Sequence, residues 1–318
     1  MFEKVSPLHI DKVADRIAGA MVDWAYEHSE DEPRVAVEVL IGHGKCYIIA
    51  ESSFEFQFEE VREIVDRIAG KQFELELKVV PQNIHLEKNQ QGLVRCGDNG
   101  IFKGVRTSSE ENELSRFARY MYDNVIASDG KYILNKDIKI GIPKEGEFSS
   151  SNLTVCQSGI QYDNLRKAIS SFFKNTDYTV KINPLGYWEA DLNNDSGATN
   201  RKLGSDMGRG ATGGGLMGKD LSKADVSVNI FLYLLLNKPQ RLKMTIHNSN
   251  LCCMLDMLDR LIDKSKDCDS IETSCSIGDE YVFIMDEKIK FYDIVRIVKE
   301  YIFTCYGGFE KLAEWGLV

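Results

Sequence analysis

The sequence predicts an α+β protein made of three similar α/β units, with the sheets on the inside and the helices on the outside. Two observations support this fold class. Apolar residues recur at helical spacing in some segments and alternate in others. A mixed order of helices and strands then recurs, with leading helices roughly one hundred residues apart; the copies share this pattern but no visible sequence identity.

The composition is typical of a globular chain. Of the 318 residues, 43% are hydrophobic and 28% are charged, and the length suits two or three compact units. The longest apolar run, around residues 230–236, is too short for a membrane span, and the first residues lack the apolar stretch of a signal peptide. The eight cysteines form no Cys-x-x-Cys pair, which disfavours zinc and suits reduced thiols. We therefore expect a cytoplasmic protein with no membrane partner.

The net charge of −10 argues against nucleic-acid binding, because such binding draws on a broad basic surface. A local basic pocket for one phosphorylated ligand remains compatible with this charge.

The first unit, residues 1–105, opens with a helix that places Val13, Ile17 and Met21 on one face. The Gly42-His43-Gly44 segment lies between two alternating runs and indicates a hairpin turn. After the opening helix, the unit is expected to contain strands at 34–41 and 45–51, a helix at 58–69 and a strand at 73–80.

The hairpin carries two carboxylates, Glu38 and Glu51. If the loop is His43-Gly44 alone, residue 38 opposes residue 49, and the two carboxylates share one face; a three-residue turn would place them on opposite faces. A carboxylate among apolar strand residues is costly unless it is paired or bound to a cation, whereas an exposed sheet face would explain it without a ligand.

The second unit, residues 106–190, is expected to hold helices at 114–127 and 162–173 and strands at 139–142, 153–157 and 178–183. The third, residues 191–318, is expected to hold helices at 221–236, 250–263 and 291–302 and strands at 242–246 and 281–285. We expect the units to exchange segments.

Two polar, glycine-rich segments are predicted to be loops. Residues 87–104 are a candidate lid. Residues 193–223 contain many Gly, Lys, Arg and Asp, which favours a ligand loop over a disordered one. Within it, Gly213–Asp220 nearly spells a phosphate-binding P-loop, but Asp220 stands where Ser or Thr would coordinate magnesium.

Cations cluster in this second loop. Arg201, Lys202, Lys219 and Lys223 suit a polyphosphate, and the alternative is a solvated charged loop. At the start of the first helix, His9, Asp11 and Lys12 also crowd together. Asp11 is either a helix-cap acid or a magnesium ligand, and His9 and Lys12 could face phosphate.

The order of these features is specific. His9-x-Asp11-Lys12, Glu38, Glu51, Gly97-Asp98, Asp137-x-Lys139, Arg201-Lys202 and Gly218-Lys219-Asp220-x-Ser222-Lys223-x-Asp225 follow one another in a fixed series. The series resembles that of the S-adenosylmethionine synthetase (methionine adenosyltransferase) family. The resemblance runs from about Val5 to Asp225, and the Gly-Lys-Asp-x-Ser-Lys-x-Asp segment is its most specific part.

The resemblance implies an activity and a fold. The family joins L-methionine to ATP through attack of the sulfur on the ribose C5′, releases triphosphate, and hydrolyses it to pyrophosphate and phosphate. It also implies three α/β units around a pseudo-threefold axis, two Mg²⁺ ions and a K⁺ ion per site, and active sites shared in a homodimer or dimer of dimers.

The resemblance also implies roles for individual residues. Catalytic positions around the triphosphate are His9, Lys139, Arg201, Lys202, Lys219 and Lys223. Substrate-binding positions are Glu51, Gln82, Asp98, Asp137, Trp188 and Asp195. Metal positions are Asp11 and Asp225 for magnesium and Glu38 for potassium.

The chain departs from the family at framework positions. Ile10 replaces the usual proline and Asn99 the usual glutamine, and the chain is shorter than typical members. The charged positions are kept, which predicts an active but divergent enzyme. Two alternatives stay open: a non-catalytic nucleotide-binding regulator, and a tripolyphosphatase or other ATP-dependent transferase that lacks the methionine side.

Overall fold

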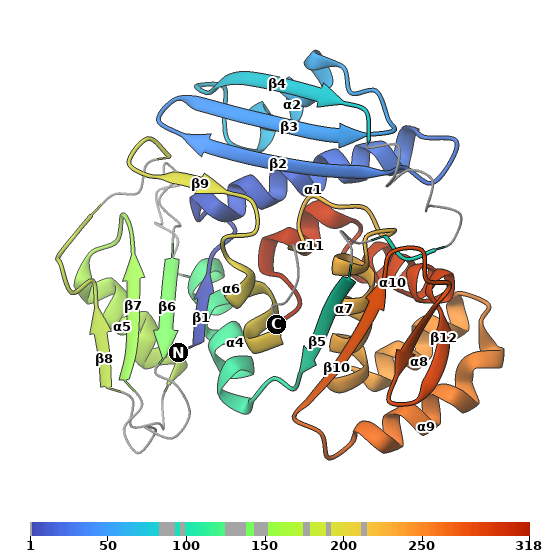
Figure 1. The fold of residues 1–318 in the computed structure, drawn as a ribbon. Coiled ribbons are helices and arrows are strands. Elements are labelled where there is room, and N and C mark those ends of the chain that lie inside the picture. The colour runs from blue at the N-terminus through green and yellow to red at the C-terminus, as the bar shows by residue number, and fades with distance from the viewer. Residues whose placement is uncertain are drawn as a thin grey trace.

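The computed structural model describes residues 2–82, 93–95, 99–124, 138–142, 152–173, 179–188, 192–210 and 215–318. Its elements gather into three regions around α1 (Ile10–His28), α6 (Leu203–Met207) and α11 (Phe309–Trp315) (Figure 1). Helices and sheets are mixed throughout, as the sequence predicts. The pseudo-threefold axis and the unit boundaries stay predictions.

The first region, at the top of Figure 1, is a four-stranded sheet in the order β4-β3-β2-β9. Its strands are β2 (Val35–Gly42), β3 (Lys45–Ser52), β4 (Glu74–Val80) and β9 (Ser196–Ala198). The parallel pair β3–β4 is joined through α2 (Phe58–Ile68), as a parallel connection requires. Alternate residues of β2 and β3 are buried, and α1 packs on that face.

The β2–β3 hairpin has the two-residue loop considered above. Gly42 pairs with Lys45, so His43 and Gly44 form the turn, both with positive φ angles of 50° and 76°. Glu38 therefore opposes Ile49, and Glu51 lies on the same exposed face, as the shorter loop predicted.

The second region is a sheet in the order β1-β6-β7-β8, covered by helices with a core of their own. Its elements are β1 (Phe2–Val5), β6 (Ile138–Ile142), β7 (Asn152–Gln157), β8 (Thr179–Ile182), α4 (Ser109–Asn124) and α5 (Tyr162–Phe172). The first strand of the chain thus completes a sheet formed by residues more than one hundred positions later, which no local pattern reveals.

The third region holds four of the described α-helices and two small sheets, β5–β10 and β11–β12. Its elements are α7 (Ala224–Asn237), α8 (Pro239–Asn248), α9 (Leu255–Ser265), α10 (Phe291–Cys305), β5 (Asn99–Val105), β10 (Ser270–Ser276), β11 (Tyr281–Ile284) and β12 (Glu287–Lys290). No helix in the described ranges is both long and apolar enough to cross a membrane.

Three predicted segments are wrong. The strand at 242–246 lies inside α8, where Leu242 and Ile246 are buried at i and i+4 while Met244 is 58% exposed. The end of the predicted lid, 99–104, belongs to β5, which pairs along its whole length with β10. Part of the predicted loop 193–223 folds as β9, α6 and a 3₁₀ turn at Gly208–Gly210.

Candidate functional site

Two charged segments run along one edge of β2, opposite the edge that pairs with β3. At one end, β9 pairs with Leu40–Gly42, and Thr199 N donates to Val39 O at 3.1 Å. At the other end, Val37 N donates to Gly218 O at 2.7 Å and Asp220 N donates to Val35 O at 3.0 Å. Backbone pairing along this edge of β2 therefore positions the segments that carry Arg201-Lys202 and Lys219-Asp220.

The first group of charges, the α1 cluster, consists of His9, Asp11, Lys139, Arg201 and Lys202. Asp11 Oδ1 accepts a hydrogen bond from Ala198 N at 2.9 Å, and its Oδ2 accepts one from Lys202 Nζ at 2.7 Å. Arg201 Nη1 lies 3.5 Å from Asp11 Oδ1. The carboxylate is thus buried and held by β9 and two cations.

His9 and Lys139 complete the α1 cluster. His9 caps α1, because its Nδ1 accepts a hydrogen bond from Asp11 N at 3.2 Å. Lys139 Nζ lies 2.9 Å from Glu3 Oε2, and the pairing of Val5 with Lys139 brings β6 beside the start of α1. The α1 cluster therefore unites five of the residues predicted from the sequence.

The electrostatics of the α1 cluster favour anions. Burial, together with the Lys202 charge, lowers the pKa of His9 to about 4, so the ring is neutral at pH 7. Burial alone would raise the pKa of Asp11, but the hydrogen bonds from Lys202 and Ala198 and the Lys202 charge hold it below its usual value.

Glu38 adjoins the α1 cluster through Thr199. Thr199 Oγ1 donates a short hydrogen bond to Glu38 Oε2, and the same hydroxyl accepts one from Val39 N at 3.3 Å. On the same exposed face of the hairpin, Leu40, Tyr47 and Ile49 are 49%, 42% and 55% exposed. The Glu38 carboxylate thus lies among exposed apolar side chains and accepts a hydrogen bond from the Thr199 hydroxyl.

Asp195 lies just before β9, where its Oδ1 accepts a hydrogen bond from Ser196 N at 2.7 Å.

The second group, the α7 cluster, lies at the start of α7 and consists of Arg95, Lys219, Asp220, Lys223 and Asp225. Lys219 bridges to Ala36 of β2 and is 9% exposed, so it is not on an open loop. Lys223 precedes α7 and Asp225 lies in its first turn. Burial and the charges of Arg95 and Lys219 lower the pKa of Lys223.

Two of the positions that the resemblance assigns to substrate binding, Glu51 and Gln82, lie near the α7 cluster. Gln82 is buried and its Nε2 donates to Glu51 O at 3.1 Å, while the Glu51 carboxylate is close enough to act on the Arg95 charge. Trp188 is 36% exposed, its carbonyl accepts a hydrogen bond from Gly159 N, and no described contact joins its ring to either cluster. Asp98 and Asp137 lie outside the described residues.

The two clusters do not merge within one chain. Asp11 bonds to Ala198, which pairs with Leu40, whereas Lys219 bridges to Ala36. Ala36 and Leu40 lie four positions apart, or about 13 Å along β2. The structure therefore presents two half-sites, one with Asp11 and one with Lys219 and Asp225.

The sequence left open whether Lys12 faces a phosphate, and the structure buries its side chain instead. Its Nζ lies 2.5 Å from Asp206 Oδ1 and 3.3 Å from Asp15 Oδ2, and all three side chains are almost fully buried. Burial would lower the pKa of Lys12, but the two carboxylates raise it, so the ammonium stays charged. Lys12 thus ties α1 to α6, next to Lys202.

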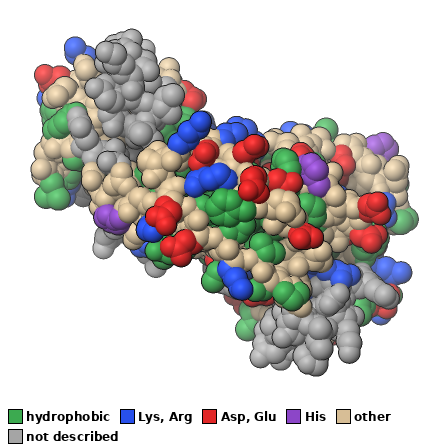
Figure 2. All heavy atoms as spheres, turned by 90° about the horizontal axis from the view of Figure 1, so that it is seen from above, with side chains coloured by type: hydrophobic (Ala, Val, Ile, Leu, Met, Phe, Trp, Pro, Cys, Tyr) green, Lys and Arg blue, Asp and Glu red, His purple; other side chains and the backbone are tan. Residues whose placement is uncertain are grey.

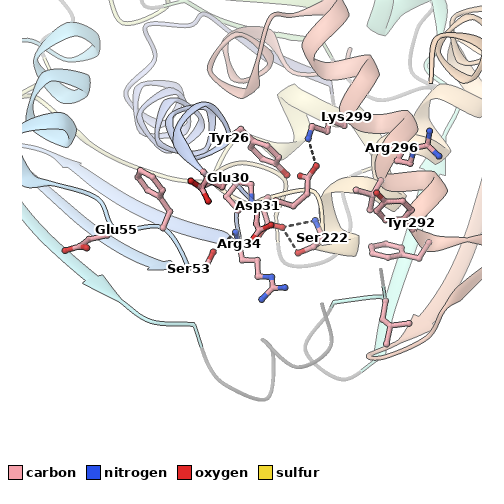
Figure 3. A pocket seen from close by; sticks show the side chains of 18 residues that line it. Tyr26, Glu30, Asp31, Arg34, Ser53, Glu55, Ser222, Tyr292, Arg296 and Lys299 are labelled. Atoms are coloured by element: carbon pink, nitrogen blue, oxygen red, sulfur yellow. Dashed lines mark hydrogen bonds and ion pairs between the residues drawn. The ribbon is translucent and has the colours of Figure 1, made fainter. Parts of the chain in front are cut away.

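A cavity of about 670 Å³ adjoins the α7 cluster (Figure 3). It lies between the segment after α1, the end of β3 and one face of α10, and Asp220 and Ser222 form part of its wall. Figure 3 shows Arg34 between Ser53 and Ser222. Sequence reasoning missed this cavity and the buried Arg95, because single charged residues form no pattern.

The comparisons with known proteins agree on one family. No family model matches the chain. It is 26% identical over 271 residues to the S-adenosylmethionine synthase of Zymomonas mobilis, covering 71% of this chain and 69% of that protein. Similar proteins of that name from Helicobacter pylori (25% over 269 residues, 71% and 69%) and Azobacteroides pseudotrichonymphae (29% over 285 residues, 71% and 66%) also match.

A solved structure shares the fold. An unusual S-adenosylmethionine synthetase from Campylobacter jejuni superposes with a TM-score of 0.64 and 17% identity, covering 89% of this chain and 79% of that one. The resemblance read from the sequence is thereby confirmed: the chain is a divergent relative of the S-adenosylmethionine synthetase family.

Proposed function

We propose that the protein makes S-adenosylmethionine from L-methionine and ATP, releases triphosphate, and hydrolyses it to pyrophosphate and phosphate. The observation that carries the proposal is the pair of half-sites on one edge of β2. Each combines lysines with a carboxylate, and their residues are those that the resemblance assigns to the triphosphate and its metals.

The residues suit this chemistry. A thioether sulfur bears no proton and needs no general base, so the reaction requires no Ser-His or Cys-His pair. The difficulty lies in the departure of a highly charged triphosphate. Lys139, Arg201 and Lys202 from one half-site and Lys219 and Lys223 from the other would stabilise the charge that develops on it. His9, neutral with Nδ1 occupied, would donate from Nε2.

The carboxylates suit magnesium. Among the described residues, no three Asp, Glu, His or Cys side chains gather into a ready-made metal site. Mg²⁺ is commonly held by one or two carboxylates together with substrate phosphates, which matches one carboxylate in each half-site. Asp11 and Asp225 would hold Mg²⁺, which neutralises phosphate charge when bound. Glu38 would face K⁺.

Two half-sites on one chain favour an active site shared between two copies. The exposed face of β2 and β3, with Leu40, Tyr47 and Ile49, is an apolar surface beside Glu38. Figure 2, which views the molecule from above, shows apolar side chains at the surface between acidic and basic ones. We propose that this face joins a homodimer, with further pairing into a dimer of dimers.

The test is incubation of the purified protein with methionine, ATP, Mg²⁺ and K⁺, followed by mass detection of the products. The expected result is the sulfonium product together with pyrophosphate and phosphate. Cleavage of added tripolyphosphate without sulfonium would instead establish a phosphatase. Nucleotide binding without turnover would establish a regulator and overturn the proposal.

A further inference from the structure

We propose that Arg95 is a positioning residue that holds Lys219 and Lys223 in place for the leaving triphosphate, an inference that rests on the proposed function. Arg95 is fully buried and lies just before residues outside the described ranges. It belongs to neither of the two charged segments that the sequence singled out. Its side chain nevertheless contacts Asp220, the residue after Lys219, and its backbone bridges to Lys223.

The side chain of Arg95 acts on the residues between the two lysines. Its Nη2 lies 3.3 Å from Asp220 Oδ2, and its Nη1 donates to Ser222 Oγ at 3.0 Å. Asp220, also fully buried, accepts hydrogen bonds at Oδ2 from Val35 N and at Oδ1 from Ser222 N, both at 2.8 Å. The guanidinium therefore pairs with the Asp220 carboxylate, which also accepts hydrogen bonds from β2 and from the backbone of Ser222.

The backbone of Arg95 acts on the second lysine. Ala224 N donates to Arg95 O at 3.0 Å, and Arg95 forms a parallel bridge with Lys223. On the other side, Val94 pairs with the turn after β10, since Val94 N donates to Asp279 O and Gly278 N donates to Val94 O. Arg95 and its neighbour Val94 thus connect the turn after β10 with the start of α7, and Asp220 links Arg95 to β2.

Stability alone is a weak reason for this arrangement. A buried ion pair gains little over well-packed apolar residues, because both charges must be desolvated. The Nε of Arg95 also has no hydrogen-bond partner among the described residues. The planar guanidinium does fix the orientation of the loop that carries the lysines, because it contacts Asp220 and Ser222 at the same time, which a lysine cannot do.

Arg95 is fully buried and forms an ion pair with Asp220, so its charge is neutralised within the protein and its guanidinium is not exposed to a ligand. Arg95 therefore acts on triphosphate through the two lysines and Asp220 rather than by touching it.

The experiment compares Arg95→Lys, Arg95→Met, Asp220→Asn and the double variant Arg95→Met/Asp220→Asn with the unchanged full chain. Binding of inorganic tripolyphosphate with Mg²⁺ is measured by calorimetry, and kcat and the KM values for ATP and methionine by product formation. For Arg95→Met, we expect the tripolyphosphate Kd to rise about tenfold and kcat to fall about a hundredfold, with the methionine KM little changed. Arg95→Lys should retain part of the binding.

The double variant tests whether Arg95 acts through Asp220. If it does, the double variant should lose no more activity and no more tripolyphosphate affinity than the less active of the two single variants, because the two residues form one unit. Additive losses in kcat/KM would overturn the inference. The inference would also be overturned if both Arg95 variants bound tripolyphosphate as tightly as the unchanged chain and had the same kcat per folded protein.

Arg106→Lys is the matched control. The Arg106 guanidinium donates to the carbonyls of Leu236, Ser265, Lys266 and Cys268, away from both clusters. This variant should lower Tm but leave tripolyphosphate binding unchanged. If the unchanged protein makes no sulfonium, the proposed function fails, but the tripolyphosphate Kd of the Arg95 variants still decides the role of Arg95.

Discussion

At the scale of single residues, burial separates side chains that can react from those that cannot. Burial raises the pKa of the Cys46 thiol to about 12, although the Arg62 charge opposes this, while Cys252, Cys253 and Cys305 are exposed. At pH 8 we therefore expect iodoacetamide to alkylate the three exposed cysteines and to leave Cys46 unmodified. Mass spectrometry of the labelled peptides measures this.

The control for this prediction is the same labelling in urea. Unfolding removes the burial, so Cys46 should then react as fast as Cys252. Equal labelling of Cys46 and Cys252 in the folded protein would show that β3 opens readily, contrary to the packed sheet described above.

The order of charged residues along the chain predicted which of them lie together in the α1 cluster. His9, Asp11, Arg201 and Lys202 were read as one series, and the structure brings them together. The sequence left the direction of Lys12 open, because residue type does not reveal which way a helix turns its side chains. The part played by Arg95 was not predicted, since it depends on contacts with residues more than one hundred positions away.

At the scale of elements, Gly218 determines how the segment carrying Lys219 meets β2. Its φ is +80°, and a Cβ there would lie 2.3 Å from Val37 O, a backbone atom that cannot move freely. We expect Gly218→Ala to lower the free energy of unfolding by about 2 kcal/mol and to reduce turnover, because Lys219 is displaced. Urea unfolding and product formation measure the two effects.

Gly204→Ala is the matched control for this prediction. Gly204 lies in α6, and a Cβ there would meet no atom within 4 Å. Alanine should therefore raise the free energy of unfolding by about 0.5 kcal/mol, by restricting the unfolded chain. An equal effect of the two substitutions would contradict the role given to the approach of Gly218 to Val37.

The long elements of the fold were predictable, and the short ones were not. The helices α1, α2, α5 and α10 and the β2–β3 hairpin follow from periodicity and turn residues. The strands β1 and β9 are four and three residues long, and they form by pairing with distant strands. The α8 segment was misread because Leu242, Met244 and Ile246 mimic alternation, although Pro239 begins a new helix.

At the scale of the whole molecule, the exposed face of β2 and β3 is predicted to join two copies. Ile49 is 55% exposed and lies opposite Glu38, so Ile49→Glu places two like charges side by side in this surface. We expect this variant to sediment as a monomer and to lose activity. Phe283→Glu, at a position that is 58% exposed on β11, should leave the assembly intact. Monomeric unchanged protein would contradict the proposed dimer.

The separation of the half-sites makes a stronger prediction about the assembly. Asp11→Ala and Lys219→Ala should each abolish most activity alone, the first through magnesium and the second through the leaving group. If each active site takes Asp11 from one copy and Lys219 from the other, a hybrid dimer of the two variants keeps one intact site. Random pairing makes half the dimers hybrid, so the refolded mixture should regain about a quarter of the unchanged activity. If both residues served one site within a single chain, every site in the mixture would lack one of them, and the mixture would stay as inactive as its components.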